Sequence, residues 1–313
     1  MKDLLTPIDR ELIKAELTDD KLLRTTNKAG NLIYLTTASE SPNIMKEIAR
    51  IRELAFRLCG AGSGKVFDMD EFDWAERPYK QLFVWYPQNE EIVGGYRLIF
   101  GNEVKINENG QPDLVTAGMY KFSEKFIKEY LPSTIELGRS FVHPDYQATK
   151  MGSKSLYSLD NLWDGLGAIT VLRPDMKYFF GKVTVYPSYD EVARECIFTF
   201  LNTYFPDAEN LVEPIEPFNR PEIAKDFEGL FKGVGFKEEY KILNSNVRER
   251  GVNIPPLVNT YMGLSAKMKS FGYAVCEELG GLIEFAIMVP IYEMYEEKKA
   301  RHIETFVDRG FKL

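Results

Sequence analysis

The sequence predicts an α/β fold in which helices flank a mixed central sheet. Three observations support this prediction. In the middle of the 313-residue chain, apolar runs typical of strands alternate with helical patterns. Pairs of strand-like runs separated by short polar stretches occur toward both ends, and no internal repeat or low-complexity segment interrupts the order. With 44% hydrophobic and 27% charged residues, the composition is that of an ordinary globular protein.

The first hundred residues contain the clearest element. The apolar run at 30–38 predicts a strand. Ser41 is a favourable N-cap, Pro42 stands at the first helical position, and apolar residues recur at helical spacing as far as Gly60, so we expect a helix there. Two apolar runs within 80–100, separated by four polar residues, predict a hairpin.

The later elements follow from the same patterns. We expect strands at 134–142 and 178–185, and helices at 119–131, 155–169 and 188–205 with Ser188 as the cap of the last. Residues 206–240 are rich in Pro, Glu and Asp and carry little periodicity, so we expect a long surface excursion. The expected order ends with a helix at 255–268, strands at 272–278 and 282–289, and a terminal helix from Tyr292.

We expect one domain with additions at its ends: a peripheral lead-in at 1–30, the main domain at 31–291 and a charged tail at 292–313. The formal net charge of −8 argues against binding nucleic acid by bulk electrostatics. The charged N-terminal stretch lacks the apolar core of a secretory signal, and the longest apolar run is too short to span a bilayer. The sequence therefore predicts a soluble, cytoplasmic protein.

Cysteine and histidine are too sparse for a metal centre. The three cysteines lie far apart, so we expect each to be a small buried residue in a reducing compartment. Of the two histidines, His143 follows a strand-like run and His302 lies in the charged tail. A lone histidine is more often a turn or packing residue than a ligand, and we expect no metal and no covalent nucleophile.

Two segments between residues 59 and 76 are candidates for ligand-binding sites. The run CGAGSGKV (59–66) lacks two residues of a phosphate-binding loop and follows a helix, so we expect a glycine-rich helix exit instead. Four acidic residues, interleaved with aromatic ones, then gather in six positions: Asp68, Asp70, Glu71 and Asp73. Such a run is usually a solvated loop, whereas the aromatic residues favour a loop folded over a ligand.

Charged residues also occupy strands that otherwise resemble core. Arg97 lies in an apolar strand and needs a carboxylate partner, for which Asp70, Asp73 and Glu136 are the candidates. Glu136 and Arg139 lie on the strand at 134–142. Both positions are open to two interpretations, a structural ion pair and a reaction centre.

Taken together, these motifs resemble a known family. The helix segment RIRELAF is followed by DMDEFD, VGGYRL and ELGRSFVHPDY, in an order and spacing similar to the acyl-homoserine-lactone synthases, a branch of the GNAT acyltransferases. The resemblance is closer to the ornithine-lipid and glycine-lipid N-acyltransferases, often labelled haemolysin-like. It includes Leu162–Leu166 and Pro255–Ala266 and covers roughly residues 32–290.

This resemblance implies a GNAT-like fold and transfer of a fatty, or 3-hydroxy fatty, acyl group to the amine of a small amino acid in aminolipid synthesis. It implies Glu136 and Arg139 as catalytic residues. The substrate-binding residues that it implies are Arg52, Phe56, Asp70, Asp73, Arg97, Ser140 and His143. Lys150 and Lys154 are implied to bind the acyl donor.

The implied donor is the phosphopantetheine arm of acyl carrier protein, or alternatively acyl-coenzyme A, with no permanently bound cofactor. At 147–152 the sequence QATKMG has Lys150 where the pyrophosphate-binding motif of ordinary GNAT enzymes has its central glycine, which favours the carrier protein. Between residues 139 and 182, six Lys or Arg stand against four Asp, so a modestly basic face is expected to meet an acidic carrier protein.

The chemistry suits these residue types. An amine attacks a thioester directly, so the reaction needs a proton acceptor and oxyanion donors rather than a protein nucleophile. Two alternatives remain open. One is an acyl-homoserine-lactone-type synthase, and the other is a non-enzymatic lipid-binding or haemolysin-like protein. Peripheral association with the inner face of the membrane is also compatible with the sequence.

Overall fold

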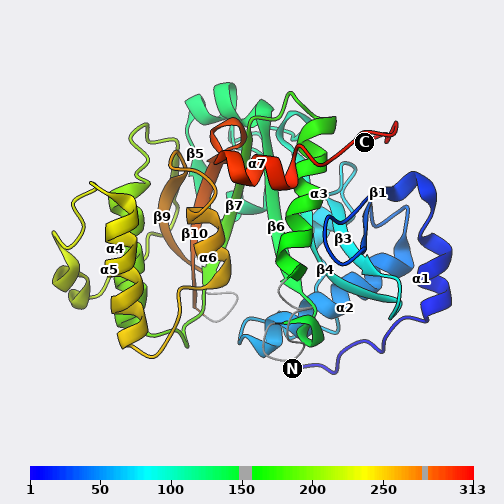
Figure 1. The fold of residues 1–313 in the computed structure, drawn as a ribbon, viewed down its shortest axis with the longest axis horizontal. Helices are drawn as coiled ribbons and strands as arrows, with labels where there is room; N and C mark the ends of the chain where they lie inside the picture. Colours follow the sequence, from blue (N-terminus) through cyan, green and yellow to red (C-terminus); the bar gives the residue numbers. More distant parts are fainter. Residues whose placement is uncertain (148–156, 277–280) are drawn as a thin grey trace. The chain divides into compact units, whose positions relative to one another are not determined.

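The computed structural model describes residues 1–147, 157–276 and 281–313 (Figure 1). The contacts within it divide the chain into two compact units. Unit 1 comprises Met1–Val104, Ser133–Lys177 and Tyr295–Leu313, and unit 2 comprises Lys105–Pro132 and Tyr178–Met294. The expected domain limits at residues 30 and 291 stay a prediction.

Unit 1 contains five antiparallel strands. In spatial order these are β1 (Leu22–Thr25), β2 (Leu32–Thr36), β3 (Lys80–Tyr86), β4 (Glu91–Phe100) and β6 (Thr134–Val142). The hairpin expected within 80–100 is the β3–β4 pair, and the strand expected at 134–142 is β6 with the same bounds. β3 and β4 are almost wholly buried, because Phe83, Val84, Leu98 and Phe100 pack on both faces of the sheet.

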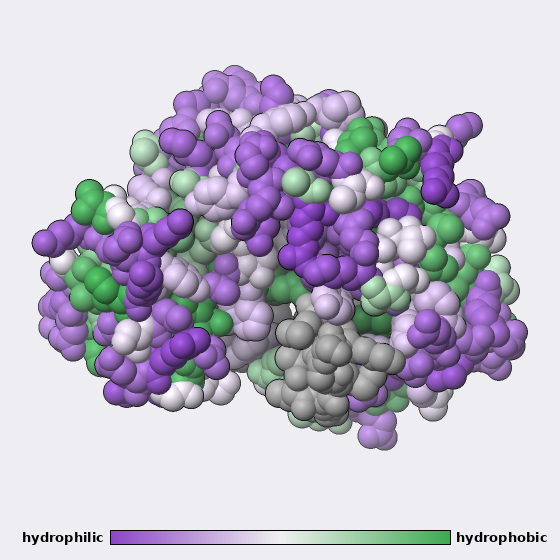
Figure 2. Space-filling view, in the orientation of Figure 1, coloured by the Kyte–Doolittle hydropathy of each residue, from purple (hydrophilic) through white to green (hydrophobic). Residues whose placement is uncertain are grey.

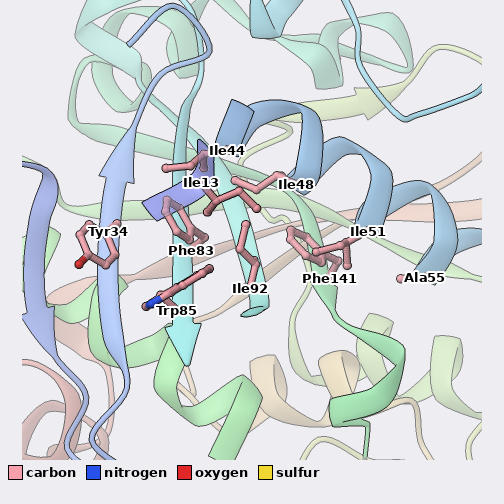
Figure 3. Packing of buried hydrophobic residues seen from close by; sticks show 10 residues of the cluster. All are labelled: Ile13, Tyr34, Ile44, Ile48, Ile51, Ala55, Phe83, Trp85, Ile92 and Phe141. Carbon is pink, nitrogen blue, oxygen red and sulfur yellow. The ribbon is translucent and has the colours of Figure 1, made fainter. Parts of the chain in front are cut away.

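Helix α2 (Pro42–Leu58) packs on this sheet with α1 (Arg10–Glu16). Pro42 stands at the first helical position, as expected. Figure 3 shows Ile44 and Ile48 of α2 directed toward Phe83 and Ile92 of the sheet, with Ile51 beside Phe141. Residues 1–30, expected to be a peripheral lead-in, contribute α1 and β1 to unit 1, and Ile13 is buried in this cluster.

Two further helices of unit 1 approach each other closely. α3 (Ser158–Leu172) meets α7 (Glu296–His302) at Gly167, where a Cβ atom would lie 2.1 Å from the carbonyl oxygen of His302. The His302 Nδ1 atom lies 2.8 Å from the Asp164 carboxylate, which also accepts a hydrogen bond from the backbone N–H of Asn27. The expected terminal helix therefore anchors the C-terminal segment to α3, and His302 is a structural residue.

Unit 2 contains three antiparallel strands in the order β7 (Tyr178–Val185), β10 (Leu282–Pro290) and β9 (Lys269–Cys276). A second pair joins β5 (Tyr120–Phe122) to β8 (Val212–Pro214). The helices of unit 2 are α4 (Glu191–Tyr204), α5 (Phe236–Glu249) and α6 (Pro256–Met262). Aromatic side chains fill its core, and the Phe198 and Tyr273 rings stack with centroids 3.8 Å apart.

Four expectations about these elements were wrong. Residues 119–131 form β5 and a π-helical turn (Phe126–Tyr130) rather than one helix, because Phe122 and Phe126 both pack on Phe180. Asp190 caps α4 in place of Ser188, through a 2.8 Å hydrogen bond from the Ala193 N–H. The excursion at 206–240 includes β8 and the start of α5, which the sequence did not indicate. Cys59 is exposed because it caps the end of α2, and only Cys196 of the three cysteines is fully buried.

Candidate functional site

Unit 1 brings most of the expected site residues into one charged network. α2 contributes Arg52, the loop after it contributes Asp68, Asp70 and Asp73, β4 contributes Arg97 and β6 contributes Arg139. The acidic run is therefore a loop folded onto arginine side chains. It is not a solvated loop.

Arg52 and Asp73 form the buried centre of this network, and neither side chain has exposed surface. Arg52 Nη2 donates to Asp73 Oδ2 at 3.1 Å, and its Nε lies 3.1 Å from Asp68 Oδ2. Asp73 also accepts from the Gln81 amide at 3.0 Å and from the backbone N–H of Asp70 at 3.2 Å. Because its hydrogen-bonding capacity is used within the protein, Asp73 holds the loop in place.

Asp70 and Arg139 form the accessible end. Arg97 Nη1 donates to Asp70 Oδ1 at 2.7 Å and lies 3.4 Å from Asp73 Oδ1. Arg139 Nη2 lies 3.2 Å from Asp70 Oδ2, and its Nε lies 3.1 Å from Asp68 Oδ2. The side chains of Arg139 and Asp70 are 25% and 18% exposed, whereas that of Arg97 is 1% exposed, so solvent reaches Asp70 and Arg139 and does not reach Arg97.

The formal charges of these three arginines and three aspartates cancel. Burial opposes ionisation of Asp70, but the hydrogen bond and charge of Arg97, with the charges of Arg139 and Arg52, outweigh it and hold the Asp70 pKa below its ordinary value. Burial likewise opposes protonation of Arg97, yet Asp70 and Asp73 raise the Arg97 pKa above its ordinary value. Asp70 and Arg97 are therefore both ionised at neutral pH.

Glu136 joins this site through Tyr79. The Tyr79 hydroxyl donates a hydrogen bond to Glu136 Oε2, and both residues are buried. The Arg97 guanidinium lies 5.1 Å from the centroid of the Tyr79 ring, and the Phe72 ring contacts Tyr79 edge-on. The Tyr79 side chain therefore links the carboxylate of β6 to the arginine of β4.

A β-bulge interrupts β6 beside this carboxylate. The register shifts between two pairs on either side of Tyr96, namely Gly95–Phe141 and Arg97–Gly138. Two residues of β6, Arg139 and Ser140, thus lie opposite the single residue Tyr96. Arg139 adopts a φ of +48°, in the left-handed region that residues other than glycine rarely occupy.

The bulge explains the spacing of Glu136 and Arg139. In a regular strand, side chains alternate between faces, so residues three apart point in opposite directions. Glu136 shares its face with Gly138, where an added Cβ would lie 3.6 Å from the Arg97 side chain. The extra residue at the bulge lets Arg139 reach the Asp70 carboxylate on that same side.

The two glycines of VGGYRL permit close approach of strands at this point. A Cβ atom at Gly94 would lie 2.6 Å from the carbonyl oxygen of Phe141, and one at Gly95 would lie 2.7 Å from that of Leu82. Neither contact can be relieved by a flexible side chain, because both neighbours are backbone atoms. Gly94 therefore allows β4 to lie against the bulged part of β6, and Gly95 allows it to lie against β3.

Residues 51–156 match the family model of an acetyltransferase (GNAT) domain. A glycine N(alpha)-acyltransferase of Phocaeicola vulgatus is 54% identical over 307 residues, covering 98% of this chain and 94% of that protein. A glycine N(alpha)-acyltransferase of Bacteroides thetaiotaomicron is 53% identical over 308 residues, covering 98% of this chain and 91% of that protein. This chain belongs to their family of GNAT N-acyltransferases.

Membership of this family confirms the expected α/β GNAT fold and the expected enzyme class. The non-enzymatic alternative is thereby set aside. The segment matched by the GNAT domain begins just before Arg52 and extends beyond Arg139, so it contains the whole charged network and the bulge.

Three other expected site residues of the acyltransferase lie outside the network of ion pairs. Phe56 is partly buried and packs against the core cluster between α2 and the sheet. Ser140 is the second residue of the bulge. The His143 Nδ1 atom accepts from the backbone N–H of Asp145 at 3.2 Å, and burial lowers the His143 pKa although nearby Asp145 and Glu91 oppose this. Substrate binding by these three residues remains a prediction.

The expected donor residues Lys150 and Lys154 lie outside the described part of the chain. The basic face expected over 139–182 is largely neutralised where it is described. Arg139 pairs with Asp68 and Asp70, Arg173 lies 2.7 Å from Asp175, and Lys182 pairs with Glu284. Each of these three charges is therefore offset by a carboxylate of the protein itself.

Sequence reasoning missed three members of the site. In the sequence Asp68 is only one member of the acidic run, and no motif distinguishes Tyr79 or Gln81. Tyr79 lies 57 positions before Glu136 in the sequence, so only the fold brings them together. The signal that could have indicated Tyr79 and Gln81 is their polar character in and just before an apolar strand, because buried polar groups need hydrogen-bond partners.

The run at 59–66 is a helix exit, as expected. The carboxylate of Glu53 accepts hydrogen bonds from the backbone N–H groups of Ser63 and Gly64 at 3.0 and 2.9 Å. These donors are therefore occupied by a side chain of α2. Over the described ranges, the structure contains no group of three potential metal ligands and no helix with the length and apolarity to cross a bilayer.

Proposed function

We propose that this acyltransferase moves a fatty or 3-hydroxy fatty acyl group from acyl carrier protein to the amine of glycine, with ornithine as the second candidate acceptor. Glycine is favoured because both relatives described above carry glycine N(alpha)-acyltransferase as their name. The product would be the first intermediate of an aminolipid made in the cytoplasm. The observation that carries the proposal is the bulged strand that brings Glu136 and Arg139 to the Asp70–Arg97 pair.

The charges around the site suit an amino-acid acceptor. The arginine–aspartate network is neutral, so an ionised Glu136 adds one negative charge that attracts the acceptor ammonium. The acceptor carboxylate needs donors. Arg97 Nε is buried without a hydrogen-bond partner, and Arg139 is partly exposed. We assign the carboxylate to Arg139, with the free Arg97 donor behind it, and assign Asp70 to orient both arginines.

In the proposed reaction, Glu136 accepts a proton from the acceptor ammonium, directly or through a water molecule. The neutral amine forms a bond to the thioester carbonyl carbon, and the carbonyl oxygen becomes an oxyanion. Collapse of this intermediate breaks the carbon–sulfur bond, and the thiolate takes up a proton released from the nitrogen. Backbone N–H groups at the β6 bulge, where the ladder with β4 is interrupted, are our candidates for the oxyanion donors.

The experiment that tests this function is incubation of the purified protein with acyl carrier protein thioesters and a panel of amino acids, followed by mass spectrometry. N-acylglycine as the main product supports the proposal. A lactone formed only with S-adenosylmethionine supports the acyl-homoserine-lactone alternative. Faster turnover with acyl-coenzyme A than with the matching carrier thioester overturns the proposed donor while leaving the acceptor intact.

A further inference from the structure

Four basic side chains on and just before α5 have no ionic partner within the described ranges of the chain. Lys232, Lys237, Lys241 and Arg248 are all exposed, and among the described residues no carboxylate lies within ion-pair distance of any of them. Some other exposed cations of unit 2 are paired, since Lys125 pairs with Glu209 and Lys225 pairs with Glu222. The 17-residue segment at 232–248 thus concentrates unpaired positive charge in a protein whose net charge is −8.

The spacing places these charges on one face of the helix. Lys237 and Lys241 are four residues apart, and Arg248 follows seven residues later, so all three project from the same side. Like charges four residues apart, such as Lys237 and Lys241, destabilise a helix. This single like-charge pair on an exposed face is unfavourable for the isolated protein and becomes favourable when an acidic surface covers it.

Helix α5 contains three carboxylates, Glu238, Glu239 and Glu249, and in the described part of the chain none of them lies within ion-pair distance of these cations. Glu239 is turned inward, where it accepts from the backbone N–H of Lys232 at 3.0 Å and from the Tyr204 hydroxyl at 2.7 Å. Glu249 accepts from the Ser245 hydroxyl at 3.2 Å. Figure 2 shows mainly hydrophilic residues, with a few hydrophobic ones between them, on the surface over α5.

We propose that this face of α5 is the docking surface for the acyl carrier protein, a small acidic protein. The inference rests on the carrier-protein donor proposed above and adds the place where the carrier binds. A carrier protein presents its thioester at the end of a flexible prosthetic arm, so its docking surface need not include the reacting atoms. Val234 and Ile242, which are 68% and 40% exposed, supply apolar contacts beside the charges.

An anionic bilayer is the other acidic surface that could cover these charges, and the packing of α5 argues against it. A membrane-surface helix inserts its apolar face into the lipid. In α5 that face is already used, because Leu243 and Val247 are fully buried and Phe236 packs edge-on against the rings of Phe200 and Tyr204 in α4. The helix therefore offers a charged surface for a protein and lacks a free apolar face for lipid.

The test is a double charge reversal, Lys237→Glu with Lys241→Glu, in the full-length protein. The matched control is Lys46→Glu with Lys267→Glu, two exposed lysines outside α5 that change the net charge equally. Binding of holo acyl carrier protein is measured by fluorescence anisotropy at several salt concentrations. Turnover is measured with long-chain acyl carrier protein and with the matching N-acetylcysteamine thioester, which has no protein to dock.

We expect the double reversal to weaken carrier binding and raise KM for the carrier thioester by roughly tenfold or more, with a smaller salt dependence than wild type. The ratio of kcat/KM for the carrier thioester to that for the small thioester should fall accordingly, and the control should keep the wild-type ratio. Equal carrier binding by wild type and the double reversal overturns the docking surface.

Two further outcomes are distinguishable. If wild type neither binds the carrier protein nor prefers its thioester, the proposed donor fails and the docking surface fails with it. If the double reversal keeps carrier binding but loses sedimentation with vesicles of phosphatidylglycerol and phosphatidylcholine, the face binds membrane and the carrier assignment is overturned.

Discussion

Glu136 and Arg139 lie three residues apart on β6, yet both side chains reach the group around Arg97. Glu136 does so through the Tyr79 hydroxyl, and Arg139 does so through the Asp70 carboxylate. The bulge opposite Tyr96 makes this possible at the expense of a left-handed backbone at Arg139. The position thus combines a backbone conformation that suits glycine with a side chain that pairs with Asp68 and Asp70. Such strained positions cluster at functional sites.

This relationship predicts an unusual order of stability among Arg139 variants. Arg139→Ala and Arg139→Gly both remove the guanidinium, but only glycine adopts a φ of +48° without strain. The glycine variant should therefore be more stable than the alanine variant by about 1 kcal/mol, in reverse of their usual order within strands. Denaturant unfolding of the two variants measures the difference. An alanine variant as stable as the glycine variant would show that the backbone at residue 139 is unstrained.

We expect removal of the Tyr79 hydroxyl to change the pH dependence of kcat. Tyr79→Phe keeps the ring beneath Arg97 and removes the hydroxyl that donates to Glu136. A hydrogen bond to a charged group contributes about 1.5–3 kcal/mol. Its loss should lower kcat at neutral pH by roughly tenfold and move the acid limb of the pH–rate profile to higher pH, with activity partly restored in alkaline buffer. A uniform loss across the whole pH range would mean that Tyr79 only supports packing.

The two ends of the acidic loop should respond differently to mutation. Asp73 has no exposed surface and pairs with both Arg52 and Arg97, so Asp73→Ala should destabilise the protein by about 3–5 kcal/mol. Asp70 is partly exposed, and Asp70→Asn should instead raise KM for the amino acid far more than KM for the thioester. Thermal melts and two-substrate kinetics on both variants distinguish the roles. Equal losses of stability would assign both carboxylates to structure alone.

We also expect the ionised Asp70 carboxylate to contribute to the free energy of unfolding, and this contribution to be lost in acid. Its pKa in the folded protein is lowered, so its ionised form stabilises the fold above the ordinary aspartate pKa of about 3.9. That contribution is lost as the pH falls through the lower folded-state value, because the unfolded chain takes up the proton first. The free energy of unfolding of Asp70→Asn should therefore vary less with pH than that of wild type below about pH 4. Parallel curves for the two proteins would contradict this.

The sequence predicted the elements that have a clear local pattern of apolar residues. β6 and β7 have the expected bounds, and α2 begins at the expected proline. Helix α5 was missed because its N-cap is Gly235 in a left-handed conformation and only Leu243 and Val247 form its fully buried apolar face. Both the N-cap and the apolar periodicity of α5 are therefore weaker sequence signals than those of α2.

The site was predictable as a set of charges and not as a geometry. Unpaired arginine in an apolar strand requires a carboxylate, which correctly indicated Asp70 and Asp73 for Arg97. Asp73 is assigned to holding the loop and Asp70 to binding substrate because the Asp73 side chain is fully buried and the Asp70 side chain is partly exposed. Only the folded structure reveals this difference in burial. Tyr79 depends on a contact between β6 and the residue preceding β3, which no local pattern encodes.

The central claim is that Glu136 accepts the proton of the acceptor amine, and Glu136→Gln tests it most directly. The glutamine keeps the shape of the side chain and can still accept a hydrogen bond from Tyr79. We expect turnover to fall by roughly 10²–10⁴-fold with the melting temperature nearly unchanged. The loss should shrink at high pH, where more of the free acceptor amine is already neutral. Near-normal turnover in the folded variant, together with a large drop in melting temperature, would contradict the account and leave Glu136 a structural residue.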